Sequence, residues 1–223
     1  MTDPLEPVSA LSALGDPTRR SAYDCVCAQG RPVGRDDVAT ALGIGRTLAA
    51  YHLDRLAKEG LLSVTYARRS GRTGPGAGRP AKLYERSQRE LAVSVPPRDY
   101  GLAARLLAHA AAHDEDGGTR RALRGAAEAL GREIAATAPA PPDVERLLRE
   151  RGYEPYEDDA GVMRLRNCPF HTVAQSHPEV VCDMNLSLLG SIFAGLDTDV
   201  EAVLEPGPGR CCVAIKPIRQ AED

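Results

Sequence analysis

Apolar residues recur at helical spacing along most of the chain and alternate with polar residues in a few short segments. In the first 90 residues this pattern predicts short helices followed by a two-stranded hairpin. Asp16-Pro17 is a typical helix start, and Gly30 and Gly43 are typical residues just after a helix end. The expected helices are 8–14, 16–29, 35–43 and 46–59, and the expected strands are 61–66 and 81–85.

Residues 99–138 predict two longer helices joined at Asp114–Gly118. The second helix carries apolar residues at spacings of four, three and four, which resembles a coiled-coil seam. An intramolecular helical hairpin and a dimer contact both explain such a seam, and its narrow, alanine-rich face favours the dimer. The apolar face of the first helix is Leu102, Leu106, Leu107 and Ala110, and the seam of the second is Leu123, Ala127, Leu130 and Ile134.

The sequence pattern from residue 143 onward predicts a compact unit of helices and strands. We expect helices at 144–151, 169–176 and 179–195, two strands within 152–166, and further strands at 200–204 and 210–215. The fold class is therefore α+β and mostly helical. The expected regions are 1–90 for the short helices and the hairpin, 91–140 for the two longer helices and 141–223 for a small cysteine-bearing α+β domain.

Composition and charge narrow the function. With 223 residues and 43% apolar residues, the chain can bury a core. The net charge of −3 is uneven: residues 1–90 carry 14 basic and 10 acidic residues, and within them residues 46–89 carry 10 and 3. A basic block on an otherwise acidic chain is typical of nucleic-acid binding, although a solvated basic loop also explains it.

The start of the chain has neither a basic segment nor an apolar one, so we expect no signal peptide. No apolar run approaches the ~18–20 residues that span a bilayer. These patterns predict a soluble, cytoplasmic, nucleoid-associated protein with no membrane partner.

The order helix, helix, turn, helix, hairpin is that of a winged helix-turn-helix. On the helix at 46–59, Ala49, Leu53 and Leu56 form the buried stripe, and polar side chains on the other faces can contact phosphates or a guanine edge. The Gly- and Arg-rich loop between the strands adds further cations. The candidate DNA-binding residues are Arg46, Thr47, Tyr51, Arg55, Lys58, Arg68, Arg69, Arg72, Arg79 and Lys82.

Two motifs carry a family resemblance over residues 8–90. Val38-Ala39-x-x-Leu42-Gly43, followed by Thr47 and by His52-Leu53-x-x-Leu56-x-x-x-Gly60-Leu61-Leu62, resembles the ArsR-type winged-helix repressors. The wing sequence Gly78-Arg79-Pro80-Ala81-Lys82-Leu83-Tyr84 resembles that of the SufR-like branch. The resemblance implies a transcriptional regulator, a repressor, that carries an iron–sulfur cluster on cysteines of its C-terminal region.

The chain has six cysteines, and in a cytoplasmic protein we do not expect them to form structural disulfides. Four of them fall between residues 168 and 212, and three of these, Cys168, Cys182 and Cys211, lie at expected element junctions. Thiolates suit zinc, copper(I) or iron–sulfur clusters, but no CxxC knuckle is present. Cys25 and Cys27 lie two apart on a helix, face different sides, and are interpreted as buried small apolar residues.

The resemblance implies that Cys168, Cys182 and Cys211 are cluster ligands, because Asn-Cys-Pro, Pro-Glu-x-x-Cys and Gly-x-Gly-x-Cys match the family pattern. The fourth ligand has no matching cysteine, which leaves His171, Cys212 or an external ligand. Strand alternation over 210–215 directs Cys211 inward and Cys212 outward, which favours His171 or an external ligand. A zinc site and simple buried thiols are the alternatives to an iron–sulfur cluster.

The other histidines suggest no site. His52 is expected to pack or to contact phosphate, and His109, His113 and His177 are interpreted as surface or interhelix residues without partners at metal spacing. No catalytic triad order, P-loop or dinucleotide motif is present, so no enzyme is expected. We expect a homodimeric regulator of an inverted-repeat operator that senses through an iron–sulfur cluster. A thiol metalloregulator binding zinc and an architectural DNA-binding protein are the alternatives.

Overall fold

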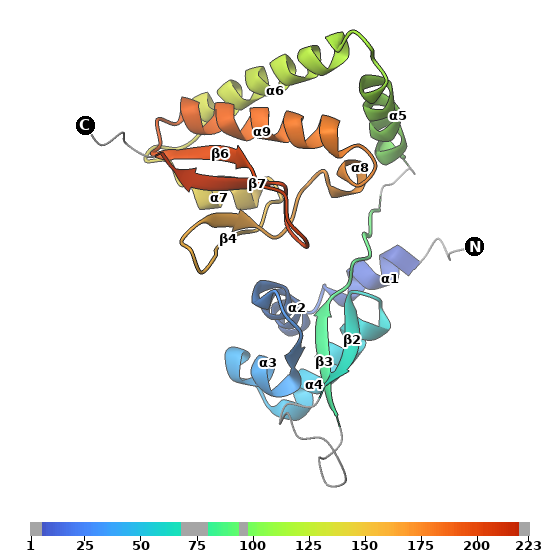
Figure 1. The fold of residues 1–223 in the computed structure, drawn as a ribbon. Helices are drawn as coiled ribbons and strands as arrows, with labels where there is room; N and C mark the ends of the chain where they lie inside the picture. The colour runs from blue at the N-terminus through green and yellow to red at the C-terminus, as the bar shows by residue number, and fades with distance from the viewer. Residues whose placement is uncertain (1–5, 68–79, 94–97, 219–223) are drawn as a thin grey trace. The chain divides into compact units, whose positions relative to one another are not determined.

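The computed structural model describes residues 6–67, 80–93 and 98–218. The chain is α+β, with about half of its residues in helices and with two small antiparallel sheets (Figure 1). It divides into two compact units, Met1–Arg98 and Asp99–Asp223. The two helices expected in the region 91–140 fall within the second of these units.

The N-terminal unit contains the expected helices and hairpin with shifts of one or two residues. Its helices are α1 (Glu6–Ala13), α2 (Pro17–Gln29), α3 (Arg35–Leu42) and α4 (Arg46–Lys58), and its strands are β1 (Val33–Gly34), β2 (Leu62–Ala67) and β3 (Ala81–Arg86).

Local signals fix where these helices begin and end. The Asp16 carboxylate accepts the backbone N–H of Arg19 at 2.8 Å, and Pro17 occupies the first position of α2. Gly30 ends α2 and Gly43 ends α3, both with the positive φ that glycine adopts readily. Gly43 thereby sets the short turn that leads into α4.

The sheet of this unit has the strand order β1-β3-β2. Tyr84 of β3 lies opposite Val33 of β1 on one side and Val64 of β2 on the other. Val38 of α3 and Leu53 of α4 are fully buried in the same core as Tyr84. The sheet therefore packs into the same core as the helices of this unit.

The C-terminal unit contains more helices and strands, and their order and bounds agree with the sequence prediction except where the last strand begins. Its helices are α5 (Tyr100–Ala112), α6 (Gly118–Thr137), α7 (Val144–Glu150), α8 (His171–Ala174) and α9 (Pro178–Gly195), and its strands are β4 (Pro155–Glu157), β5 (Met163–Leu165), β6 (Val200–Leu204) and β7 (Val213–Pro217).

Helices α6 and α9 run side by side (Figure 1), so the seam expected for a dimer is partly intramolecular. Ala127, Gly131 and Ala135 form the buried face of α6, while Leu130 remains 48% exposed. A Cβ on Gly131 would stand 2.7 Å from the carbonyl oxygen of Leu188 in α9. The helices approach this closely because small residues line the contact, whereas the leucine positions lie beside it.

The second sheet has the order β4-β5-β7-β6, with every pair antiparallel. Helix α9 contacts β6 and β7, and Ile192 and Phe193 of this helix are buried in the core with Val213 and Ile215 of β7. The last strand begins at Val213 rather than at residue 210. Cys211 and Cys212 therefore lie in the loop before it.

No helix in the described part of the chain is long and apolar enough to cross a membrane.

Candidate functional site

The side chains expected to contact DNA from α4 lie on its exposed faces. Thr47, Tyr51 and Lys58 are exposed, and Tyr51 is 60% accessible. Arg55 is exposed but pairs with Glu59 at 2.9 Å, one turn later. The stripe opposite them, with Ala49, Leu53 and Leu56 buried, is as the sequence predicts.

Two of the expected cations form ion pairs that join elements. Arg46, at the start of α4, pairs with Asp36 of α3 at 2.7 Å. Lys82 of β3 pairs with Asp54 of α4, and the Tyr84 hydroxyl donates to the same carboxylate at 2.8 Å. Burial opposes the charge on Asp54, but the hydrogen bonds from Lys82 and Tyr84 outweigh it and lower the pKa of this carboxyl. Asp54 thus holds the hairpin against the helix.

Four of the expected DNA-binding residues, Arg68, Arg69, Arg72 and Arg79, lie outside the described residues. His52 is 5% exposed and sits edge-on to the ring of Tyr51, with the centroids 5.3 Å apart. Its buried position agrees with the packing role that the sequence suggested. The alternative role of His52 in phosphate contact is unsuited to so little exposure.

Cys25 and Cys27 lie in the N-terminal unit, and both are only partly buried. Cys25 packs against that core, and burial raises the pKa of its thiol. Cys27 Sγ accepts a hydrogen bond from Arg86 Nε at 3.2 Å, so this side chain has a polar role that the sequence did not suggest. Neither lies in the unit that contains the other four cysteines.

The four cysteines of the C-terminal unit converge from three segments. Cys168 follows β5, Cys182 lies in the first turns of α9, and Cys211 and Cys212 precede β7. Cys211 is 4% exposed, and the other three are partly buried. Elements far apart in sequence are therefore needed to bring these thiols together.

Hydrogen bonds connect the thiols to one another. The Cys211 sulfur interacts with the side chains of Cys168 and Cys212, and Cys212 also interacts with Cys182. These contacts lower the pKa of Cys211 well below its usual range, because Cys168 first and then Cys212 donate to its thiolate. The same contacts raise the pKa of Cys168 and Cys212, which hold their protons. We call these four residues the thiol cluster.

A buried polar pair supports the thiol cluster from α9. Asn185 is fully buried, and its Nδ2 lies 3.5 Å from the Cys211 sulfur as a donor. The Tyr153 hydroxyl donates to Asn185 Oδ1 at 2.5 Å. Tyr153 is itself buried, and this burial raises the pKa of its hydroxyl. An N–H donor aimed at a ligand sulfur is a common way to orient and tune a metal-binding thiolate.

Backbone hydrogen bonds fix the loop that carries Cys211 and Cys212. The Cys211 N–H donates to the carbonyl of Leu165 at 2.9 Å, and the Glu205 N–H donates to the carbonyl of Cys212 at 2.7 Å. Leu165 lies at the end of β5, three residues before Cys168. The two cysteine-bearing segments are therefore joined next to their thiols.

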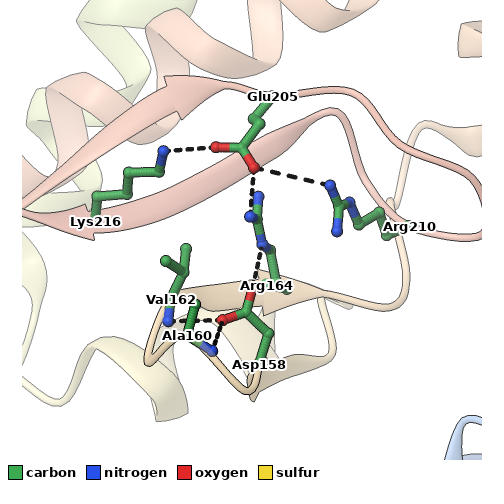
Figure 2. Close-up of polar contacts among 7 residues, drawn as sticks. All are labelled: Asp158, Ala160, Val162, Arg164, Glu205, Arg210 and Lys216. Atoms are coloured by element: carbon green, nitrogen blue, oxygen red, sulfur yellow. Dashed lines mark hydrogen bonds and ion pairs between the residues drawn. The ribbon is translucent and has the colours of Figure 1, made fainter.

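Figure 2 shows an ion network that holds the base of the same loop. Arg164 is 7% exposed and lies between two carboxylates, Asp158 at 2.8 Å and Glu205. Glu205 also pairs with Lys216 at 2.6 Å and with Arg210 at 3.8 Å. The hydrogen bond from Arg164 and then that from Lys216 lower the pKa of Glu205 to about 2. The network joins the β4–β5 hairpin to both ends of the 205–212 loop.

Cys212, rather than the His171 favoured by the sequence, lies with the other three cysteines. His171 is exposed on α8, where its Nε2 lies 3.1 Å from the side-chain nitrogen of Gln175. Cys212, by contrast, interacts with Cys211 and Cys182. The prediction that Cys212 faces away from the core was wrong, because strand alternation does not apply to residues that precede the strand.

The donor chemistry of the thiol cluster fits an iron–sulfur cluster or a zinc ion, both of which take thiolates. The positions of the side chains do not yet form a coordination shell. In the residues that the structure describes, no three histidine, cysteine, aspartate or glutamate side chains are placed so that they could hold a metal ion. The sulfurs interact with one another instead.

Comparison of the chain with protein-family models and with curated proteins gave no match.

Sequence reasoning missed the residues around the thiols. Asn185 follows Cys182 by three residues on α9 and therefore lies on the same helical face, which is a signal that could have found it. Arg164 and Glu205 carried no such signal, because they meet only when β5 and the 205–212 loop pack together.

Proposed function

We propose that this chain is a homodimeric, DNA-binding transcriptional regulator, not an enzyme, whose operator affinity is set by an iron–sulfur cluster. Cys168, Cys182 and Cys211 are the proposed ligands, with Cys212 as the fourth. The observation that carries the proposal is the convergence of four cysteines from three segments in the C-terminal unit. When bound, such a cluster supplies iron that responds to oxidants or to ligand exchange.

The N-terminal unit supports the DNA-binding part of the proposal. Helices α3 and α4 follow one another across the Gly43 turn, and the sheet order β1-β3-β2 places the β2–β3 hairpin next to them. A winged helix-turn-helix has this order of elements, with its second helix in the major groove and its hairpin as the wing. Thr47, Tyr51 and Lys58 are the exposed side chains of the proposed reading helix.

The ion pairs of Arg46, Arg55 and Lys82 are compatible with phosphate contacts. Their side chains are 62%, 43% and 37% exposed, and exposed ion pairs contribute only about 0–1 kcal/mol. A phosphate therefore competes easily for each cation. Arg55, whose partner Glu59 is the residue that caps the end of α4, carries a guanidinium that can also bind a guanine edge.

The exposed apolar face of α5 supports the homodimer. Leu102, Leu106 and Leu107 are 47%, 62% and 72% exposed, and they are neighbours on one helix. The face replaces the α6 seam as the proposed contact, since α6 is largely occupied by α9. Leu106→Asp should therefore shift the protein from dimer to monomer in sedimentation. An unchanged dimer would remove α5 from the interface.

The sensing proposal is tested by the spectrum and metal content of protein purified without oxygen. An iron–sulfur cluster predicts a brown protein with sulfide-to-iron absorption and matching amounts of iron and sulfide. Cys168→Ser, Cys182→Ser, Cys211→Ser and Cys212→Ser should each lose the cofactor. Cys25→Ser is the matched control, because Cys25 lies in the other unit, and it should retain the cofactor in full.

Zinc is the second candidate, and direct contact between the thiols favours it. Ligands of one metal ion lie closer together than ligands that surround a cluster of several irons. A colourless protein with one zinc ion and no sulfide, lost in the same four variants, would establish this alternative. A protein that holds neither iron nor zinc would overturn the sensing proposal and leave an architectural DNA-binding protein.

DNA binding is tested by replacing Arg55. Arg55→Ala should weaken binding to an inverted-repeat operator by about 1–3 kcal/mol and relax base preference at one position of each half-site. Arg149→Ala is the matched control, since Arg149 forms the same type of ion pair with a glutamate one turn away, but on α7. Equal binding by both variants would contradict the assignment of α4 as the reading helix.

A further inference from the structure

Three histidines that suggested no site in the sequence meet in the C-terminal unit. His109 and His113 lie one turn apart on α5, and His177 precedes α9. The ring centroids of His109 and His113 are 4.1 Å apart, and those of His109 and His177 are 5.6 Å apart. Helix α5 packs against α8 and α9, so the contact belongs to the fold of this unit.

We propose that His109, His113 and His177 form a binding site for a divalent late transition metal such as zinc. Neutral imidazole is the preferred ligand of these ions, and two histidines at i and i+4 present their rings on one helical face. This site is separate from the thiol cluster and does not depend on the function proposed above.

A hydrogen bond of one ring and an ion-pair contact of another leave the opposite nitrogens available. His113 Nδ1 lies 2.9 Å from the carbonyl oxygen of His109, and this contact favours the tautomer in which Nε2 has a free lone pair. His177 Nδ1 faces Glu179 Oε1 at 4.0 Å, a carboxylate next to the nitrogen that does not bind. Backbone carbonyls and carboxylates play this outer role in most histidine metal sites.

As they stand, the three rings are not placed to hold an ion, and the same is true of every other histidine, cysteine, aspartate and glutamate group in the described residues. The spacing of the ring centroids is nevertheless close to what one ion requires. With a metal–nitrogen distance of ~2.1 Å, the centroids of two rings bound to one ion lie roughly 4.5–5.5 Å apart. The pair His109–His177, at 5.6 Å, already has about this separation, whereas His109 and His113 are stacked at 4.1 Å. Rotation of the His113 ring is therefore needed, and the terminal torsion of histidine is broad and costs little to change.

Exposure suits an exchangeable ion. His109 and His113 are exposed, and the His177 side chain is 15% accessible. A fourth position remains for water, as in sites with three protein ligands. The ion would tie α5 to the segment between α8 and α9.

The test is titration of the full-length, metal-free protein with Co²⁺ alone. Cobalt bound by imidazoles gives visible d–d absorption without the thiolate-to-cobalt charge transfer that the cysteines produce, so the two sites report separately. His109→Ala and His177→Ala should each lower the affinity of the imidazole site for Co²⁺. The loss should exceed the ~10–100-fold that follows removal of a residue that only hydrogen-bonds to a metal ligand. His171→Ala is the matched control, because His171 is exposed on α8 and lies outside the trio.

The outcomes are distinct. An imidazole-type signal that disappears in His109→Ala and His177→Ala but persists in His171→Ala supports the site, provided circular dichroism shows folded variants. A wild-type protein with charge transfer alone, or with no cobalt absorption, would overturn it. So would an imidazole signal that is unchanged in both variants. Neither result bears on the proposed regulator, which is tested through iron, sulfide and the cysteine variants.

Discussion

The close contact between α6 and α9 makes a prediction that can be measured as a stability difference. A Cβ on Gly131 would meet Leu188 O and Ser191 Cβ, each at 2.7 Å, where ordinary contact begins at 3.4 Å. The two helices would have to separate locally by roughly 0.7 Å, since one of the atoms met is backbone. Gly131→Ala should therefore destabilise the C-terminal unit despite the better helix propensity of alanine.

The magnitude follows from two opposing contributions. Glycine-to-alanine replacement inside a helix stabilises by about 1 kcal/mol, and overpacking a tight contact costs about 1–3 kcal/mol. Gly125→Ala isolates the first contribution, because Gly125 lies on the same helix with nothing within 4 Å of its Cβ position. We expect Gly131→Ala to be less stable than Gly125→Ala by about 1–3 kcal/mol.

The assay is thermal unfolding of the full chain followed by calorimetry, with the transition of the C-terminal unit compared between variants. For a unit of this size, 1 kcal/mol corresponds to a shift of about 3–5 °C. Gly195→Ala probes the contact from α9, because its Cβ would lie 2.6 Å from Ala135 Cβ, and Gly190→Ala is its open-space control. Equal midpoints for Gly131→Ala and Gly125→Ala would refute the close approach of the helices.

Three further changes test other contacts. The pKa of Glu205 is lowered from 4.5 to about 2, chiefly by Arg164, so the stability that this carboxylate contributes is complete above about pH 4.5 and is lost as the pH falls toward 2. Glu205→Gln should remove this pH dependence, which is measured by comparing unfolding midpoints at pH 6 and pH 3. Tyr153→Phe should cost about 1–3 kcal/mol in urea denaturation, because it leaves the buried Asn185 oxygen without its donor. Asp54→Asn should tighten non-specific DNA binding and steepen its salt dependence, because it removes a negative charge from α4.

The helices were predictable because their signals are local. Asp16, Pro17, Gly30 and Gly43 determine where α2 begins and where α2 and α3 end, and the structure places those ends within one or two residues of the expectation. The short strand β1 was not predicted, since two residues, Val33–Gly34, are too few to show alternation. It exists because β3 offers it a pairing edge.

The candidate site was predictable only in part. The cysteines could be selected by residue type and family pattern, but their mutual contacts depend on where β7 begins. Because that strand begins at Val213, Cys212 interacts with Cys182 instead of pointing away, and His171 pairs with Gln175. The histidine trio shows the same limitation: the i, i+4 spacing of His109 and His113 was visible, but the approach of His177 required the packing of α5 on α8 and α9.

The segment 168–177 connects the two proposed metal-binding groups. Cys168, in the thiol cluster, stands at one end, His177, in the histidine trio, stands at the other, and α8 lies between them. Because metal-binding free energy is also folding free energy, occupancy of either group stabilises one end of this short segment. When the first metal orders this segment, the second metal loses less conformational entropy on binding. Each metal therefore raises the affinity for the other by the same factor. If both proposed groups bind metal, cobalt bound by the imidazoles should raise the affinity of the thiols for their cofactor, and the cofactor should raise the affinity for cobalt.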